Sequence, residues 1–257
     1  MRHIKLTLQF DGSGYSGWQV QEKDRTIQGV LESALSAITK EVIRITGCSR
    51  TDAGVHALEF VASFKTDSAM KPDEFLRAIN SNIPQDIRVM NAEECDESFH
   101  PRYDAKSKRY SYIISTAVPQ NVFLNRYAWQ MPLRNPLDVN AMKEASKVLI
   151  GEHDFSSFRA SGCGSKHPVR NVMSIEISEM PSIDFMTFKL NIPVIKVSIE
   201  ANAFLRHMVR NIVGTLVDVG KGRTSPAQME EILNAKDRSA AGKTAPSCGL
   251  FLENVRY

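Results

Sequence analysis

The chain has few cysteines and no long apolar run. Its four cysteines lie far apart and form no Cys-x-x-Cys pair, which argues against zinc spacing and a disulfide framework; they are Cys48, Cys95, Cys163 and Cys248. No apolar segment approaches the ~18 residues of a membrane span. The N-terminal residues lack the apolar centre of a signal peptide. We therefore expect a cytoplasmic protein that does not bind a membrane.

Signatures of several enzyme classes are also missing. The sequence contains no P-loop, no H-E-x-x-H motif, no G-x-S-x-G elbow and no kinase signature. Gly12, Gly14 and Gly17 have G-x-G-x-x-G spacing, but the next predicted helix begins only after Thr26, too late for a dinucleotide loop. We expect neither a metal nor a cofactor.

Charge is unevenly distributed, although the net formal charge is only +3. Residues 1–99 carry 11 Lys and Arg against 15 Asp and Glu, whereas residues 100–257 carry 21 against 14. The second half includes a basic stretch with no acid between its members Arg159, Lys166, His167 and Arg170. Such clusters suit the phosphates of a nucleic acid, and a solvated face is the ordinary alternative.

Apolar periodicity predicts an α+β protein of two halves, residues 1–100 and 101–257. The first half has the β-α-β-β-α-β order of a ferredoxin-like unit, predicted at 3–10, 27–38, 42–47, 57–65, 72–82 and 86–91. Thr26 is the expected N-cap of its first helix. The second half largely repeats that order, with strands near 110–114, 173–177, 188–192, 195–199 and 250–255 and helices near 138–150, 203–217 and from 225 onward. We expect one shared core or continuous sheet.

The run RTDAGVHA at residues 50–57 joins two predicted strands. A sheet would hold both of its ends, so that the loop presents one carboxylate, Asp52, beside one fixed cation, Arg50. This arrangement suits a positioned nucleophile or base. The structural alternative is a tight turn in which Gly54 supplies a positive φ.

Three further residues, two arginines and a tyrosine, lie on predicted helices or strands. Arg206 and Arg210 lie four residues apart on the predicted helix 203–217 and would share one face. Arg210 either extends its head group to solvent or reaches a carboxylate from a partly buried position. Tyr110 opens a strand directly after a basic run, where it could stack on a base or belong to the core.

Several motifs, in the same order along nearly the whole chain, resemble the tRNA pseudouridine synthase A family. The sequence reads FDGSGYSGWQVQ at 10–21, TIQGVLE at 26–32 and RTDAGVHA at 50–57. Further on it reads FHPRY at 99–103, KRY at 108–110, DFSSFR at 154–159, FLRHMVRNIVG at 204–214 and APSCGL at 245–250. Departures from the family pattern are small and concern Ser49, Pro101 and Arg109.

The resemblance implies a pseudouridine synthase fold and isomerisation of uridine to pseudouridine in the anticodon stem-loop of tRNA, at about positions 38 to 40, without a cofactor. It also implies a homodimer. By motif, Asp52 is the essential carboxylate, Tyr110 stacks on the uracil, and Arg210 pairs with Asp52. Leu250 lines the pocket and Arg50 contacts RNA. The basic residues Arg159, Lys166 and Arg170 are the expected phosphate contacts in a second half that completes the cleft.

Two other functions remain open at this point. Paired ferredoxin-like units also occur in RNA-binding proteins without catalytic activity, although the RNP1 pattern is absent here. A hydrolase built from Asp11, Asp52 and His56, with or without a metal, is the second alternative.

Overall fold

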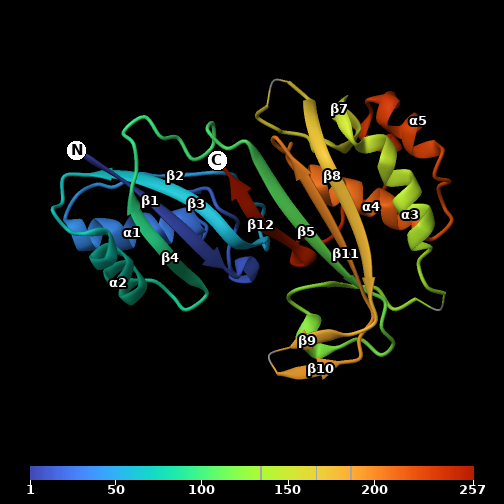
Figure 1. Cartoon of the computed structure of the whole chain (residues 1–257), viewed down its shortest axis with the longest axis horizontal. Helices are drawn as coiled ribbons and strands as arrows, with labels where there is room; N and C mark the ends of the chain where they lie inside the picture. Colours follow the sequence, from blue (N-terminus) through green and yellow to red (C-terminus); the bar gives the residue numbers. More distant parts are fainter. Residues whose placement is uncertain (134, 166, 186) are drawn as a thin grey trace. The chain divides into compact units, whose positions relative to one another are not determined.

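A computed structural model describes residues 1–133, 135–165, 167–185 and 187–257 (Figure 1). The chain forms two compact units, one of Met1–Lys106 with Phe251–Tyr257 and one of Ser107–Leu250. The last seven residues thus belong to the first unit, whereas the expected division at residue 100 assigns them to the second half. Among the described residues, no helix is long and apolar enough to cross a membrane.

The first unit has the predicted β-α-β-β-α-β order. Its elements are β1 (Arg2–Phe10), α1 (Ile27–Thr39), β2 (Ile45–Gly47), β3 (His56–Thr66), α2 (Pro72–Asn82) and β4 (Ile87–Glu94). The hydroxyl of Thr26 accepts a hydrogen bond from Gly29 N at 3.3 Å, which confirms the predicted N-cap. The strand expected near 42–47 is shorter than its apolar alternation indicates.

The sheet of the first unit is mostly antiparallel. The strand order is β4-β1-β3. Strand β2 also pairs antiparallel with β3, with Ile45 opposite Phe64 and Gly47 opposite Ala62. The C-terminal strand β12 (Leu250–Arg256) returns to this sheet and pairs in parallel with the start of β3, where Phe251 lies opposite His56. Alternate residues of β1, including Ile4 and Leu6, are fully buried. Burial of these residues anchors β1, and its pairing with β3 holds the strand that follows the loop at 48–55.

The second unit is also α+β. Its elements are β5 (Ser107–Ser115), β6 (Trp129–Gln130), α3 (Val139–Ser146), β7 (Gly151–Asp154), β8 (Val169–Met180), β9 (Ile183–Phe185), β10 (Phe188–Leu190), β11 (Val194–Ala201), α4 (Met208–Gly220) and α5 (Gln228–Ala235). The order β5-β11-β8-β7 is antiparallel throughout, and β6 runs parallel to β5. Strands β9 and β10 form a separate ribbon.

Helix α4 begins later than its apolar periodicity predicts. The expected range was 203–217, but residues 203–207 are not helical, and His207 has a φ of +61°. A residue in the left-handed region does not extend a right-handed helix backward. Arg206 therefore lies outside the helix, and the prediction that it shares a helical face with Arg210 is wrong.

Candidate active site

Asp52 lies in a tight turn between β2 and β3. Val55 N donates to Asp52 O at 3.2 Å, and Gly54 has a φ of +76°, as the turn interpretation predicts. Thr51 and Val55 are buried on either side, whereas Asp52 is only partly buried and Arg50 is exposed. A tight turn and a partly exposed Asp52 are thus compatible in this structure.

A second segment holds this turn through main-chain hydrogen bonds. We call residues 11–18 the glycine loop. Within it, Trp18 N donates to Thr51 O at 3.1 Å, and Tyr15 O accepts from Gly54 N at 3.3 Å. These two bonds bracket Asp52 on both sides. Because main-chain groups make both bonds, they hold the backbone of Asp52 without using its carboxylate.

The close contact between the two loops requires glycine. A Cβ at Gly12 would lie 2.0 Å from Val55 O, and one at Gly17 would lie 2.4 Å from Thr51 O. Gly17 also has a φ of +87°. In the sequence these glycines show the spacing of a dinucleotide motif and belong to the family motif at 10–21. Their role in supporting the Asp52 turn depends on a partner segment about forty residues away, which spacing within the motif does not reveal.

His56 is part of this support. Its ring is buried and stacks on Phe251, with centroids 4.7 Å apart. Its Nδ1 lies 3.2 Å from Gly12 N and 3.1 Å from Asp11 Oδ1. The hydrolase alternative required Asp11, Asp52 and His56 to act together. Within the described ranges, no group of three or more His, Cys, Asp or Glu side chains is arranged to hold a metal ion.

Tyr110 lies on β5 in the second unit. It pairs with Ile199 of β11, and its side chain is almost completely buried. Its ring meets that of Phe204 edge to face, with centroids 5.0 Å apart and an angle of 82° between planes. Phe204 falls within the predicted helix 203–217, but it lies in the segment before α4, where it fixes the orientation of the Tyr110 ring.

Arg210 lies in the first turn of α4 and is half-buried. Its Nε donates to Ala245 O at 2.8 Å, and Ala245 N donates to Arg210 O at 3.1 Å. This reciprocal pair fixes the side chain near its head group. A guanidinium has five N–H donors in a planar fork, so the bond from Nε also sets the direction of the two Nη groups.

Leu250 is buried at the start of β12, at the end of a closely held segment. Tyr112 Oη donates to Pro246 O at 2.7 Å, and Cys248 Sγ contacts Ala128 O at 3.5 Å. Gly249 has no room for a side chain because a Cβ there would lie 2.7 Å from Ile113 O. Burial raises the pKa of Tyr112 well above its ordinary value, which favours the protonated form that donates to Pro246 O.

The expected phosphate contacts are distributed over two segments of the second unit. Arg159 follows a short 3-10 helix and is half-buried. Arg170 begins β8 and folds back on its own loop, where it donates to His167 O at 2.9 Å and to Ser165 Oγ at 2.8 Å. Lys166 lies outside the described residues. Asp52 and Arg50 belong to the first unit, and Tyr110, Arg210 and Leu250 to the second.

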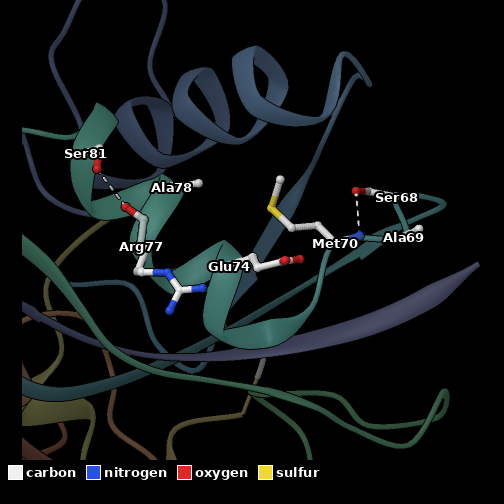
Figure 2. Close-up of a pocket in the computed structure, with 7 residues that line it drawn as sticks. All are labelled: Ser68, Ala69, Met70, Glu74, Arg77, Ala78 and Ser81. Carbon is white, nitrogen blue, oxygen red and sulfur yellow. Dashed lines mark hydrogen bonds between the residues drawn. The ribbon is translucent and has the colours of Figure 1, made fainter.

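An open hollow beside α2 contains none of the predicted site residues. It is lined by Ser68, Ala69, Met70, Glu74, Arg77, Ala78 and Ser81. Figure 2 shows that polar groups in this hollow bond locally, as in the hydrogen bond from Ser81 Oγ to Arg77 O at 2.9 Å. Arg77 also forms an ion pair with Asp73 at 3.1 Å. Nothing in this lining suggests chemistry on a substrate.

Comparison with known proteins identifies the family. The sequence matches the family model for tRNA pseudouridine synthase over residues 7–104 and 145–257. The tRNA pseudouridine synthase A of Thermoanaerobacter sp. (strain X514) is 42% identical over 257 residues, with 100% of both chains covered. The protein of that name from Thermodesulfovibrio yellowstonii is 40% identical with the same coverage. That from Coxiella burnetii (strain Dugway 5J108-111) is 41% identical over 100% of this chain and 94% of its own.

The chain belongs to the tRNA pseudouridine synthase family, which confirms the resemblance inferred from its motifs. The matched ranges include Asp52, Arg210 and Leu250, whereas Tyr110 lies between them. The full-length relatives cover that intervening stretch as well. The roles of the individual side chains remain predictions.

The glycine loop gives a direct prediction. Gly12→Ala places a Cβ 2.0 Å from Val55 O, so one of the two loops must move. We expect the free energy of unfolding to fall by about 1–3 kcal/mol and the turnover of the folded protein to fall as well. Gly14→Ala is the matched control, since nothing lies within 4 Å of its added Cβ. Urea unfolding and turnover measured on both variants check this, and equal behaviour of the two would contradict it.

Proposed function

We propose that this chain isomerises uridine to pseudouridine in the anticodon stem-loop of tRNA, at about positions 38 to 40, with Asp52 as the essential carboxylate and no cofactor. The observation that carries this proposal is a family match that includes the Asp52 turn, together with full-length relatives that bear the name of an isomerase. The half-exposed carboxylate on a fixed backbone gives further support.

The reaction relocates one bond. The bond from ribose C1′ to uracil N1 breaks, a bond from C1′ to C5 forms, the C5 proton leaves, and N1 gains a proton. Asp52 can promote this either by attacking the uridine or by removing a proton from the sugar. Both roles require an ionised carboxylate and a base that has left the helical stack.

The second unit is proposed to supply the remaining groups. Arg210 pairs with Asp52, so that a guanidinium offsets the negative charge of the carboxylate when substrate excludes water. Its anchored Nε supports this role, because the bond to Ala245 O fixes the guanidinium in one direction. Tyr110 stacks on the uracil and handles the C5 proton, Leu250 forms an apolar wall, and Arg50 contacts RNA. The edge-to-face contact with Phe204 supports a fixed orientation for the Tyr110 ring.

Four finer assignments complete the proposal. The two halves are ferredoxin-like, and in the first unit the β-α-β-β-α-β order with β2 beside β3 and β4 beside β1 supports this. The protein is a homodimer and acts in the cytoplasm. The second half provides most of the tRNA phosphate contacts through Arg159, Lys166 and Arg170, and its excess of basic residues supports that view.

Asp52→Asn separates catalysis from folding. The amide is nearly isosteric and leaves the main-chain bonds of the turn in place, so stability should change by less than about 1 kcal/mol. It supplies neither a nucleophile nor a base, and tritium release from C5-labelled tRNA uridine should become undetectable. Binding of tRNA should persist, because phosphate contacts dominate affinity. A folded variant with substantial activity would reduce Asp52 to a turn residue.

Substitutions of Tyr110 separate stacking from proton transfer. Tyr110→Phe keeps the aromatic face and loses only the hydroxyl, whereas Tyr110→Leu loses both. If the hydroxyl handles the C5 proton, the Phe variant should bind tRNA normally and turn over at least about a hundredfold more slowly. The Leu variant should also lose affinity. Wild-type turnover of Tyr110→Phe would leave Tyr110 as a stacking surface only.

The salt dependence of binding tests the basic half. Each lost phosphate contact removes about 0.7–0.9 from the slope of log affinity against log salt concentration. Arg159→Glu combined with Arg170→Glu should therefore weaken tRNA binding and flatten that slope by about 1.5. The same charge change at Lys65 and Arg77 in the first unit is the control and should leave the slope intact. An unchanged slope in the Arg159 and Arg170 variant would place the RNA elsewhere.

A further inference from the structure

Asn211, the residue after Arg210, connects α4 to three other segments. Its side chain is fully buried. Its Nδ2 donates to Phe158 O at 2.8 Å, and its Oδ1 accepts from Thr244 Oγ1 at 2.7 Å and from Arg238 Nη2 at 3.0 Å. A buried amide is costly unless both of its ends are hydrogen-bonded, and here both are. Asn211 therefore contributes specific hydrogen bonds at this buried position, and not only packing of the core.

Thr244 closes this network. Its Oγ1 donates to Asn211 and also accepts from Arg238 Nη2 at 3.0 Å, so the three side chains form a closed triangle. One helical turn later, Thr215 Oγ1 accepts from Gly242 N at 2.9 Å. Gly214 brings the backbones into contact, because a Cβ there would lie 1.7 Å from Lys243 O. Residues 242–244 are therefore attached to two successive turns of α4.

The attachment continues directly into the proposed site. Ala245, next to Thr244, forms the reciprocal hydrogen bonds with Arg210, next to Asn211. A shift of the 242–244 segment along α4 would move Ala245 O and with it the Nε of Arg210. The same segment leads within five residues to Leu250, with Pro246 held by Tyr112 on the way.

We propose that Thr244 and Asn211 are positioning residues for catalysis: the hydrogen bond between them sets the direction of the Arg210 guanidinium. This inference rests on the proposed role of Arg210. A displacement of about 1 Å in a group that must align with the reacting atoms is enough to cost as much as a hundredfold in rate. Neither residue touches the substrate.

Thr244→Val tests the proposal, because valine keeps the shape and loses the hydroxyl. We expect kcat for tritium release to fall tenfold to a hundredfold, while KM for tRNA changes less than about threefold. Thr244→Ser keeps the hydroxyl and should restore most of the rate. Equal losses in the Val and Ser variants, or a change in KM alone, would overturn the proposal.

Thr66→Val is the control for loss of a threonine hydroxyl that donates to another side chain. Thr66 is fully buried, and its Oγ1 donates to Glu41 Oε2 at 2.9 Å in the first unit. Because Thr66 is more buried than Thr244, Thr66→Val should lower thermal stability at least as much as Thr244→Val and leave kcat unchanged. If Thr66→Val reduces kcat as much as Thr244→Val, the effect is general destabilisation and the proposal fails.

Arg210→Ala distinguishes this inference from the proposed function. If Thr244 acts through Arg210, the double variant with Thr244→Val should be no slower than Arg210→Ala alone. Multiplicative losses would show that Thr244 acts by another route and overturn the positioning role. Normal turnover of Arg210→Ala would contradict the proposed function of Arg210 itself, whatever the Thr244 variants do. Loss in Arg210→Ala with normal turnover in Thr244→Val would overturn only the positioning inference.

Discussion

The contact between the glycine loop and the Asp52 turn is the constraint on which the proposed chemistry depends. Two main-chain hydrogen bonds, to Thr51 O and from Gly54 N, fix the backbone on both sides of the carboxylate. They form only because Gly12 and Gly17 lack a side chain where the two backbones meet. A carboxylate that must act on one atom of a substrate gains from such a support, since its backbone is fixed before the substrate arrives.

Arg210 in the second unit is held in a comparable way. Its own main-chain carbonyl bonds Ala245 N, and its Nε bonds Ala245 O. In both units a main-chain contact with a distant segment fixes the position of a charged residue. Glycines permit the approach in both cases, Gly12 and Gly17 in the first unit and Gly214 in the second. All three glycines lie within the motifs that carry the family resemblance.

The elements of the first unit were predictable from the sequence because their signals are local. Strand β1 alternates apolar residues, and Thr26 caps α1 as expected. The start of α4 was mispredicted because Phe204 and Leu205 continue the apolar spacing, whereas the φ of His207 ends the helix there. The return of β12 to β3 is a non-local pairing, and no periodicity indicates which strand a terminal segment will join.

The candidate site was predictable in part. The Asp52 turn was predicted from the turn-forming residues Asp52 and Gly54. The family was predicted from motifs that occur in the family's order along the chain. The support by Gly12 and the Asn211–Thr244 hydrogen bond did not emerge, because each joins residues more than thirty positions apart. Local sequence patterns do not predict contacts between residues so far apart. The only sign of them in the sequence is a glycine or an amide side chain within a motif. The roles of Asp52, Tyr110 and Arg210 stay predictions.

The most direct test of the account is to map pseudouridine in an unmodified tRNA transcript before and after incubation with the purified protein. New pseudouridine should appear in the anticodon stem-loop, at about positions 38 to 40, without any added cofactor. Incubation with Asp52→Asn should leave the same transcript unchanged. A transcript that the folded wild-type protein binds but does not modify, or modifies only outside the anticodon stem-loop, would contradict the account.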